Sequence, residues 1–173
     1  MTFTSDSVSN PFSGTFNYSA QLIDAIASTT AVFKALTVDD QLAVLWYAYT
    51  EMGRSITPAA TGAARLQLAQ GLLNEIKFLS YLDQLEFMRD LVAQKDTKLT
   101  RSYGVLTANT KLAFWYELSE LMVKGFVAPM PADYKLSRDG AQVLETLKQL
   151  DFGQQITVFR KIVSDMGVDP LAD

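Results

Sequence analysis

Two aromatic-rich stretches with helical periodicity constrain this chain more than any other feature. Residues 40–53 and 109–122 each place apolar side chains at the i, i+3, i+4, i+7 spacing that gathers them on one helix face. The shared faces comprise Leu42, Leu45, Trp46 and Tyr49 in the first stretch, and Leu112, Trp115, Tyr116, Ser119 and Met122 in the second. Both tryptophans of the chain lie in these stretches, so we predict two helices whose aromatic faces meet. On periodicity alone, such faces usually form ordinary core.

The rest of the sequence also has helical periodicity, and it shows no sustained alternation of apolar and polar residues. Helices are predicted over 18–28, 29–36, 65–79, 82–93, 99–106, 137–150 and 154–166. Thr37 and Ser137 are expected to cap helix N-termini, and Gly125 and Gly167 to end helices. Two prolines make residues 126–135 an extended connection. The sequence therefore predicts an all-α fold.

The composition indicates a globular chain with more apolar residues than its length alone explains. Hydrophobic residues make up 49% of 173 residues, and the mean hydropathy is +0.08. The longest apolar run, 42–49, is too short to cross a bilayer, so we expect a protein that does not span the membrane. The extra apolar surface is expected to be buried or to cover an apolar ligand. A net charge of −4 without a basic block argues against nucleic-acid binding.

The absence of cysteine and histidine restricts the chemistry that this chain can perform. Thiol nucleophiles, disulfides, Cys/His zinc sites and Ser-His-Asp triads are all excluded. No glycine pattern typical of phosphate binding occurs either. The sequence therefore disfavours an enzyme, although an enzyme acting on an apolar substrate stays as an alternative. Residues 1–17 have neither a basic start nor an apolar segment, so no signal peptide is expected.

Four ordered motifs resemble one known family. They are Asp-Gln-Leu-Ala-x-x-Trp-x-Ala-Tyr-x-Glu-Met-Gly at 40–53, Lys-Leu-x-Phe-Trp-Tyr-Glu-Leu at 111–118, Val-Ala-Pro-x-Pro at 127–131 and Gly-Gln-Gln-Ile-Thr-Val-x-Arg at 153–160. In this order they are similar to the N-terminal, carotenoid-binding domain of the cyanobacterial orange carotenoid protein. The similarity covers about residues 20–169, which divides the chain into an extension (1–19), a carotenoid-binding helical domain (20–169) and a tail (170–173). The family's second domain has no counterpart, so the chain resembles a stand-alone helical carotenoid protein or an excised domain.

The resemblance implies two interleaved, discontinuous four-helix bundles with a ketocarotenoid of the canthaxanthin, echinenone or 3'-hydroxyechinenone type between them. Positions that match the family's pigment contacts are Leu42, Leu45, Trp46, Tyr49, Gly62, Leu66, Met88, Asn109, Leu112, Trp115, Tyr116, Ser119, Met122, Met130, Pro131 and Ile156. At Leu66 and Ser119 the family often has methionine and glycine, and we expect Ser119 to narrow the tunnel.

The implied function is photoprotection, in which the pigment quenches singlet oxygen and phycobilisome excitation. The resemblance further implies a cytoplasmic monomer associated with phycobilisomes at the thylakoid surface. At the position of Arg160 the family uses an arginine that bridges its two domains and engages the antenna. Here three interpretations stay open for Arg160: exposure, contact with a separately encoded C-terminal-domain homologue, or a solvated charge. The alternative function is a pigment-free module that docks an antenna or such a homologue.

Overall fold

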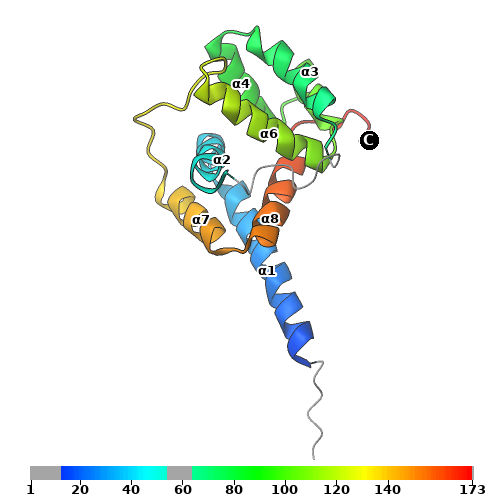
Figure 1. The fold of residues 1–173 in the computed structure, drawn as a ribbon, viewed down its shortest axis with the longest axis vertical. Helices are drawn as coiled ribbons and strands as arrows, with labels where there is room; N and C mark the ends of the chain where they lie inside the picture. Colours follow the sequence, from blue (N-terminus) through cyan, green and yellow to red (C-terminus); the bar gives the residue numbers. More distant parts are fainter. Residues whose placement is uncertain (1–12, 54–63, 173) are drawn as a thin grey trace, which may run out of the picture.

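The computed structural model describes residues 13–53 and 64–172, and every regular element in them is a helix (Figure 1). The helices are α1 (Ser13–Ala35), α2 (Val38–Met52), α3 (Leu66–Lys77), α4 (Tyr81–Val92), α5 (Lys98–Gly104), α6 (Ala108–Val123), α7 (Arg138–Gln149) and α8 (Phe152–Ser164). The predicted all-α class is therefore confirmed. None of the helices in the described residues is long and apolar enough to span a membrane.

The helices form two four-helix lobes that interleave in the sequence. The terminal lobe consists of α1, α2, α7 and α8, in which α1 packs on α7 and α8, and α2 packs on α7. The central lobe consists of α3 to α6, in which α3 packs on α5 and α6, and α4 packs on α5. The lobes meet where α6 contacts α8 and where α2 contacts α4 and α6 (Figure 1). This arrangement confirms the predicted pair of discontinuous bundles.

Local sequence signals set most helix ends where they were predicted. The Thr37 hydroxyl accepts a hydrogen bond from the Asp40 amide at 3.2 Å, and Ser137 caps α7 in the same way at 3.0 Å. Gly125 and Gly167 follow α6 and α8 with φ of +76°, the left-handed conformation that glycine adopts without strain. The predictions made for these four positions are therefore confirmed.

Two boundary predictions were wrong. Residues 18–28 and 29–36 belong to one continuous helix, α1, rather than to two short helices. The Thr29 and Thr30 hydroxyls donate to the carbonyls four residues earlier at 2.7 and 2.8 Å, so these polar residues are satisfied inside the helix. Helix α8 begins at Phe152 because Asp151, which we expected in a turn, is its N-cap and forms a capping box with Gln154.

The C-terminal segment runs back along α5 and fixes the join between the lobes. The Gly167 amide donates to the Leu91 carbonyl at 2.8 Å, and the Val168 amide donates to the Thr100 carbonyl at 3.1 Å. A Cβ atom at Gly104 would overlap the Val168 carbonyl oxygen, so only glycine permits this approach. The segment is thus held by backbone contacts that leave no room for a side chain.

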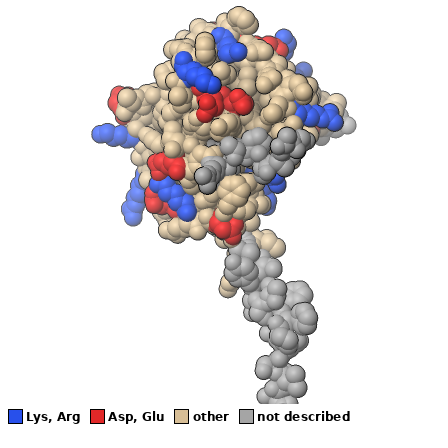
Figure 2. All heavy atoms as spheres, viewed as in Figure 1, with Lys and Arg blue, Asp and Glu red and all other residues tan. Residues whose placement is uncertain are grey.

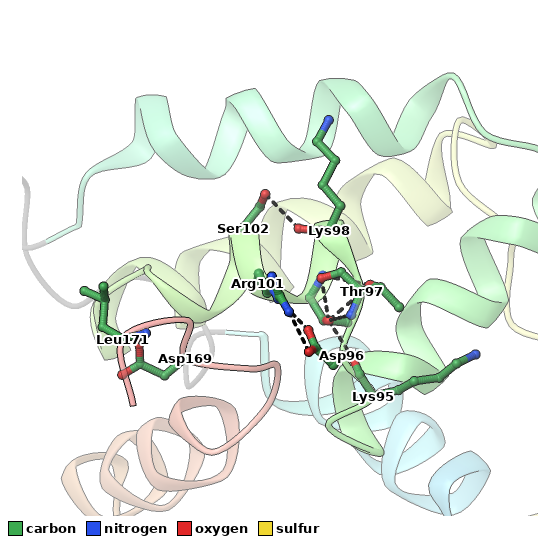
Figure 3. Close-up of polar contacts among 9 residues, drawn as sticks. Lys95, Asp96, Thr97, Lys98, Arg101, Ser102, Asp169 and Leu171 are labelled. Carbon is green, nitrogen blue, oxygen red and sulfur yellow. Dashed lines mark hydrogen bonds and ion pairs between the residues drawn. The ribbon is translucent and has the colours of Figure 1, made fainter. Parts of the chain in front are cut away.

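Polar contacts also define the start of α5. Thr97 and Thr100 form a capping box, and the Arg101 guanidinium pairs with Asp96 at 2.5 and 2.7 Å. Figure 3 shows this group beside the C-terminal segment, which carries Asp169. A seven-residue helix is too short to be stable alone. Its cap and the docked C-terminal segment therefore hold α5 in place.

Candidate functional site

An apolar pocket of about 50 Å³ lies between α2, α4, α6 and the connection from α6 to α7. Its lining residues are Leu42, Leu45, Trp46, Leu85, Met88, Trp115, Ser119, Met122, Ala128, Pro129, Met130 and Pro131. None of these described lining residues carries a charge. The pocket can therefore hold an apolar group, and it offers no side chain suited to acid–base catalysis.

The pocket brings together nine of the sixteen candidate positions named from the sequence. These nine are Leu42, Leu45, Trp46, Met88, Trp115, Ser119, Met122, Met130 and Pro131. Sequence reasoning missed the other three lining residues. Leu85 lies one turn before Met88 on the same face of α4, and Ala128 and Pro129 belong to the motif that contains Met130, so helical spacing and motif adjacency were the available signals.

Six of the other seven candidate positions are not among the residues that line this pocket. Leu112 and Ile156 are buried in the core, and Asn109 is partly buried. Leu66 is 41% exposed at the first position of α3. Gly62 lies outside the described residues. Tyr49 and Tyr116 contact each other beside the pocket.

The aromatic faces of α2 and α6 meet at this tyrosine pair. The Tyr49 and Tyr116 ring centroids are 5.6 Å apart and the rings meet edge to face, while Trp46 lies 5.8 Å from Tyr49. The Tyr49 hydroxyl donates a hydrogen bond to the Glu120 carboxylate across the two lobes. The predicted meeting of the two aromatic faces is therefore confirmed. The helices touch at the tyrosines and leave a gap at the tryptophans, where Trp46 and Trp115 line one pocket.

Trp115 is 5% exposed and has a polar partner behind it. Its indole N–H donates to the Tyr103 hydroxyl at 2.9 Å, and its ring meets Phe114 edge to face at 5.9 Å. Ser119, one turn later, donates its hydroxyl to the Trp115 carbonyl at 2.9 Å. Because this hydroxyl is satisfied by the helix itself, Ser119 adds little polarity to the pocket.

The connection that covers the pocket is anchored at both ends by buried polar side chains. On α4, Gln84 is 1% exposed, donates to the Phe126 carbonyl at 3.1 Å and accepts from the Ala128 amide at 2.8 Å. On α2, Asp40 accepts from the Tyr134 hydroxyl at 2.9 Å. Burial alone would raise the pKa of Asp40, but hydrogen bonds from Ser137 and Tyr134 outweigh it and lower the pKa. The connection therefore spans both lobes over the pocket.

Arg160 does not lie in the pocket. It is on α8, its side chain is partly buried, and its Nε atom is buried without a hydrogen-bond partner in the described part of the chain. The side chain of Arg160 is therefore neither fully exposed nor fully buried. On the face shown in Figure 2, acidic and basic side chains are interspersed rather than gathered by sign.

Two tyrosines near the pocket are expected to make the free energy of unfolding depend on pH in the alkaline range. The hydrogen bond to Glu120, with burial, raises the pKa of Tyr49 to about 12, and burial with the bond to Asp40 raises the pKa of Tyr134 to about 12. An unfolded tyrosine ionises near pH 10, so this stabilisation is complete below about pH 10 and is lost as the pH rises toward 12. We expect the free energy of unfolding, measured in urea, to fall over this window.

The matched variant for this pH dependence is the double substitution Tyr49→Phe and Tyr134→Phe. It removes both phenols and keeps both rings. We expect it to be less stable than wild type at pH 8 and to lose stability less steeply between pH 10 and 11. Equal slopes for the two proteins would contradict this origin of the pH dependence.

Sequence comparison places these features in a family. The model of the N-terminal domain of the orange carotenoid protein matches residues 19–169. The chain belongs to the orange carotenoid protein family. It is 73% identical, over the full length of both chains, to an orange carotenoid-binding domain-containing protein of Nostoc sp. strain PCC 7120. It is 47% identical to the orange carotenoid-binding protein of Synechocystis sp., and here it spans 96% of its own length and about half (51%) of that relative.

Solved structures of the family have the same fold. The Red Carotenoid Protein of Anabaena (Nostoc) sp. PCC 7120, which binds canthaxanthin, matches with a TM-score of 0.76 at 43% identity, covering 83% of this chain and 99% of that one. The Orange Carotenoid Protein of the same organism, also binding canthaxanthin, matches with a TM-score of 0.77 at 50% identity, covering 85% of this chain and 48% of that one. The present chain therefore has the fold of this family's helical domain.

Proposed function

We propose that this chain binds one ketocarotenoid between its two lobes and acts in photoprotection. The observation that carries the proposal is the apolar pocket, where the two tryptophans of the chain, one from each lobe, face a shared space. The family relationship adds support, because two similar proteins bind canthaxanthin. We extend the same ligand class, of the canthaxanthin, echinenone or 3'-hydroxyechinenone type, to this chain.

The chemistry of the lining suits a stiff polyene. A carotenoid is a rigid apolar rod roughly 30 Å long, about the length of a 20-residue helix. Burying it gains free energy in proportion to its apolar area, and a stiff ligand loses little conformational entropy. Trp46 and Trp115 present flat faces to a conjugated ring, and Met88, Met122 and Met130 have flexible side chains that adapt to the methyl groups of a polyene.

Pigment binding requires the lobes to separate further. A known apolar cavity that binds benzene has a volume of about 150 Å³, whereas this pocket is about 50 Å³. The proposed widening lies between α2 and α6, where one tyrosine contact and the Tyr49 hydrogen bond to Glu120 join the lobes. The buried contacts at the other side, around α8 and the C-terminal segment, are the proposed hinge.

The proposed role of the bound pigment is to accept energy from singlet oxygen, and from excited phycobilisome pigments, and to release it as heat. The chemistry belongs to the cofactor, and the protein solubilises and orients it. We further propose a cytoplasmic monomer that associates with phycobilisomes. Arg160 is the proposed contact for a separately encoded C-terminal-domain homologue, because its side chain on α8 is only partly buried.

The test of the proposed function is colour. We expect the chain, produced in a host that makes canthaxanthin, to purify with a visible absorption band and about one extractable carotenoid per protein. The matched control is the same host without the ketolase, in which ketocarotenoid is absent. A folded but colourless protein from the canthaxanthin host would contradict pigment binding and favour the pigment-free interaction module.

A further inference from the structure

Tyr103 is the most completely buried polar aromatic residue in the described part of the chain, and it is not one of the candidate pigment contacts. It lies on α5 with 0% exposure. Its hydroxyl accepts the Trp115 indole N–H at 2.9 Å and donates to the Val163 carbonyl at 2.9 Å. The hydroxyl therefore links a pocket-lining tryptophan of the central lobe to α8 of the terminal lobe.

The surroundings of Tyr103 allow its ring one position. The ring meets Phe114 edge to face at 5.2 Å, and the Lys111 ammonium lies 4.8 Å from the ring centroid. A Cβ atom at Gly167 would lie 2.6 Å from the Tyr103 ring, so glycine at this position makes room for it. Lys111 is itself fixed, since it donates to the Ser164 and Met166 carbonyls at 2.8 and 3.1 Å. Burial raises the pKa of Tyr103 well above its usual value, so the hydroxyl keeps its proton at neutral pH.

The indole N–H is the one polar group through which the orientation of the Trp115 side chain can be fixed. Rotation about χ2 of tryptophan has broad minima, so the torsional preference of the side chain defines the plane of the ring only weakly. A hydrogen bond from the N–H to a fixed hydroxyl selects one plane. The Trp115 side chain that this bond holds lines the same pocket as Trp46.

We propose that Tyr103 is a positioning residue for the pigment site, whose hydroxyl sets the orientation of the Trp115 indole against the pigment. The inference rests on the proposed function. Tyr103 does not touch the pigment in this account, and it acts through Trp115 alone. A residue that only stabilises the fold would not depend on Trp115 for its effect on the pigment.

The test begins with Tyr103→Phe, which removes the hydroxyl and keeps the ring. Val163 retains backbone partners at its carbonyl, whereas the indole N–H loses its acceptor. In the canthaxanthin-loaded protein we expect a changed visible circular dichroism band and pigment binding that is weaker by up to about tenfold. One hydrogen bond sets this upper limit, because the bond also exists in the pigment-free protein. In pigment-free protein carrying Trp46→Phe, the fluorescence of Trp115 should shift as well.

Two further proteins separate positioning from general destabilisation. Ser102→Ala also removes one hydroxyl of α5 that bonds within the fold, and it should leave the visible circular dichroism unchanged. In a Trp115→Phe background, Tyr103→Phe should change pigment affinity by less than twofold, because the residue through which it acts has no N–H.

Three results would overturn the inference. The first is a loaded Tyr103→Phe protein with wild-type affinity and circular dichroism. The second is an equal effect of Tyr103→Phe with and without Trp115. The third is a wild-type chain that takes up no pigment, which would contradict the proposed function as well, whereas the first two leave pigment binding intact.

Discussion

Trp115→Leu is expected to weaken pigment binding by roughly twofold to tenfold while the protein stays helical. The substitution removes one aromatic wall of the pocket, and aromatic contacts contribute roughly 0.5–1.5 kcal/mol beyond their buried area. About 1.4 kcal/mol corresponds to a tenfold change in Kd. The measurement is canthaxanthin affinity by titration of the visible band, with far-UV circular dichroism recorded on the same samples.

The matched control for Trp115→Leu is Phe33→Leu. Phe33 is also buried, with 1% exposure against 5% for Trp115, but it belongs to α1, which contributes no candidate contact. Both substitutions shrink a core aromatic residue, and such changes commonly destabilise by a few kcal/mol. We expect only Trp115→Leu to lose pigment affinity. Equal losses of affinity in the two variants would mean that Trp115 contributes as ordinary core.

Gly104→Ala is expected to produce the largest loss of stability of any glycine-to-alanine substitution among the described glycines. The new Cβ would overlap the Val168 carbonyl oxygen, which is backbone and cannot rotate away. The C-terminal segment must then leave α5 and lose the hydrogen bonds that the Gly167 and Val168 amides donate. Overpacking and the lost hydrogen bonds together are expected to cost about 3 kcal/mol, measured by urea unfolding.

Gly71→Ala provides the matched control for this prediction. Gly71 lies inside α3, and a Cβ there would meet nothing within 4 Å. Alanine should therefore stabilise the helix by about 0.5–1 kcal/mol. If Gly104→Ala were as stable as wild type, the close approach of the C-terminal segment to α5 would be wrong.

Features set by a few neighbouring residues could be predicted from the sequence. Helical spacing identified the faces of α2 and α6, and hydroxyl side chains at Thr37 and Ser137 identified caps, because a cap depends on residues three positions apart. The prediction was wrong where a polar residue can either end a helix or form a hydrogen bond within it. We predicted two helices that meet between residues 28 and 29, yet the Thr29 and Thr30 hydroxyls bond within the continuous helix α1.

Long-range partners could not be predicted in the same way. The bond from Trp115 to Tyr103 joins two helices, and the bond from Tyr49 to Glu120 joins residues 71 positions apart in different lobes. The burial of Lys111 also depends on the end of α8, because the Lys111 ammonium donates hydrogen bonds to the Ser164 and Met166 carbonyls. Helical periodicity locates the face on which a residue lies, whereas such partners depend on how the lobes pack.

The central claim is that a carotenoid lies between the lobes in contact with both tryptophans. The most direct test is a crystal structure of the canthaxanthin-loaded protein, with difference density calculated before any pigment is built. The account predicts a continuous rod of density between α2 and α6, with Trp46 on one side of its end ring and Trp115 on the other. Density on an outer face of either lobe, with the pocket between Trp46 and Trp115 no wider than in the pigment-free structure, would contradict it.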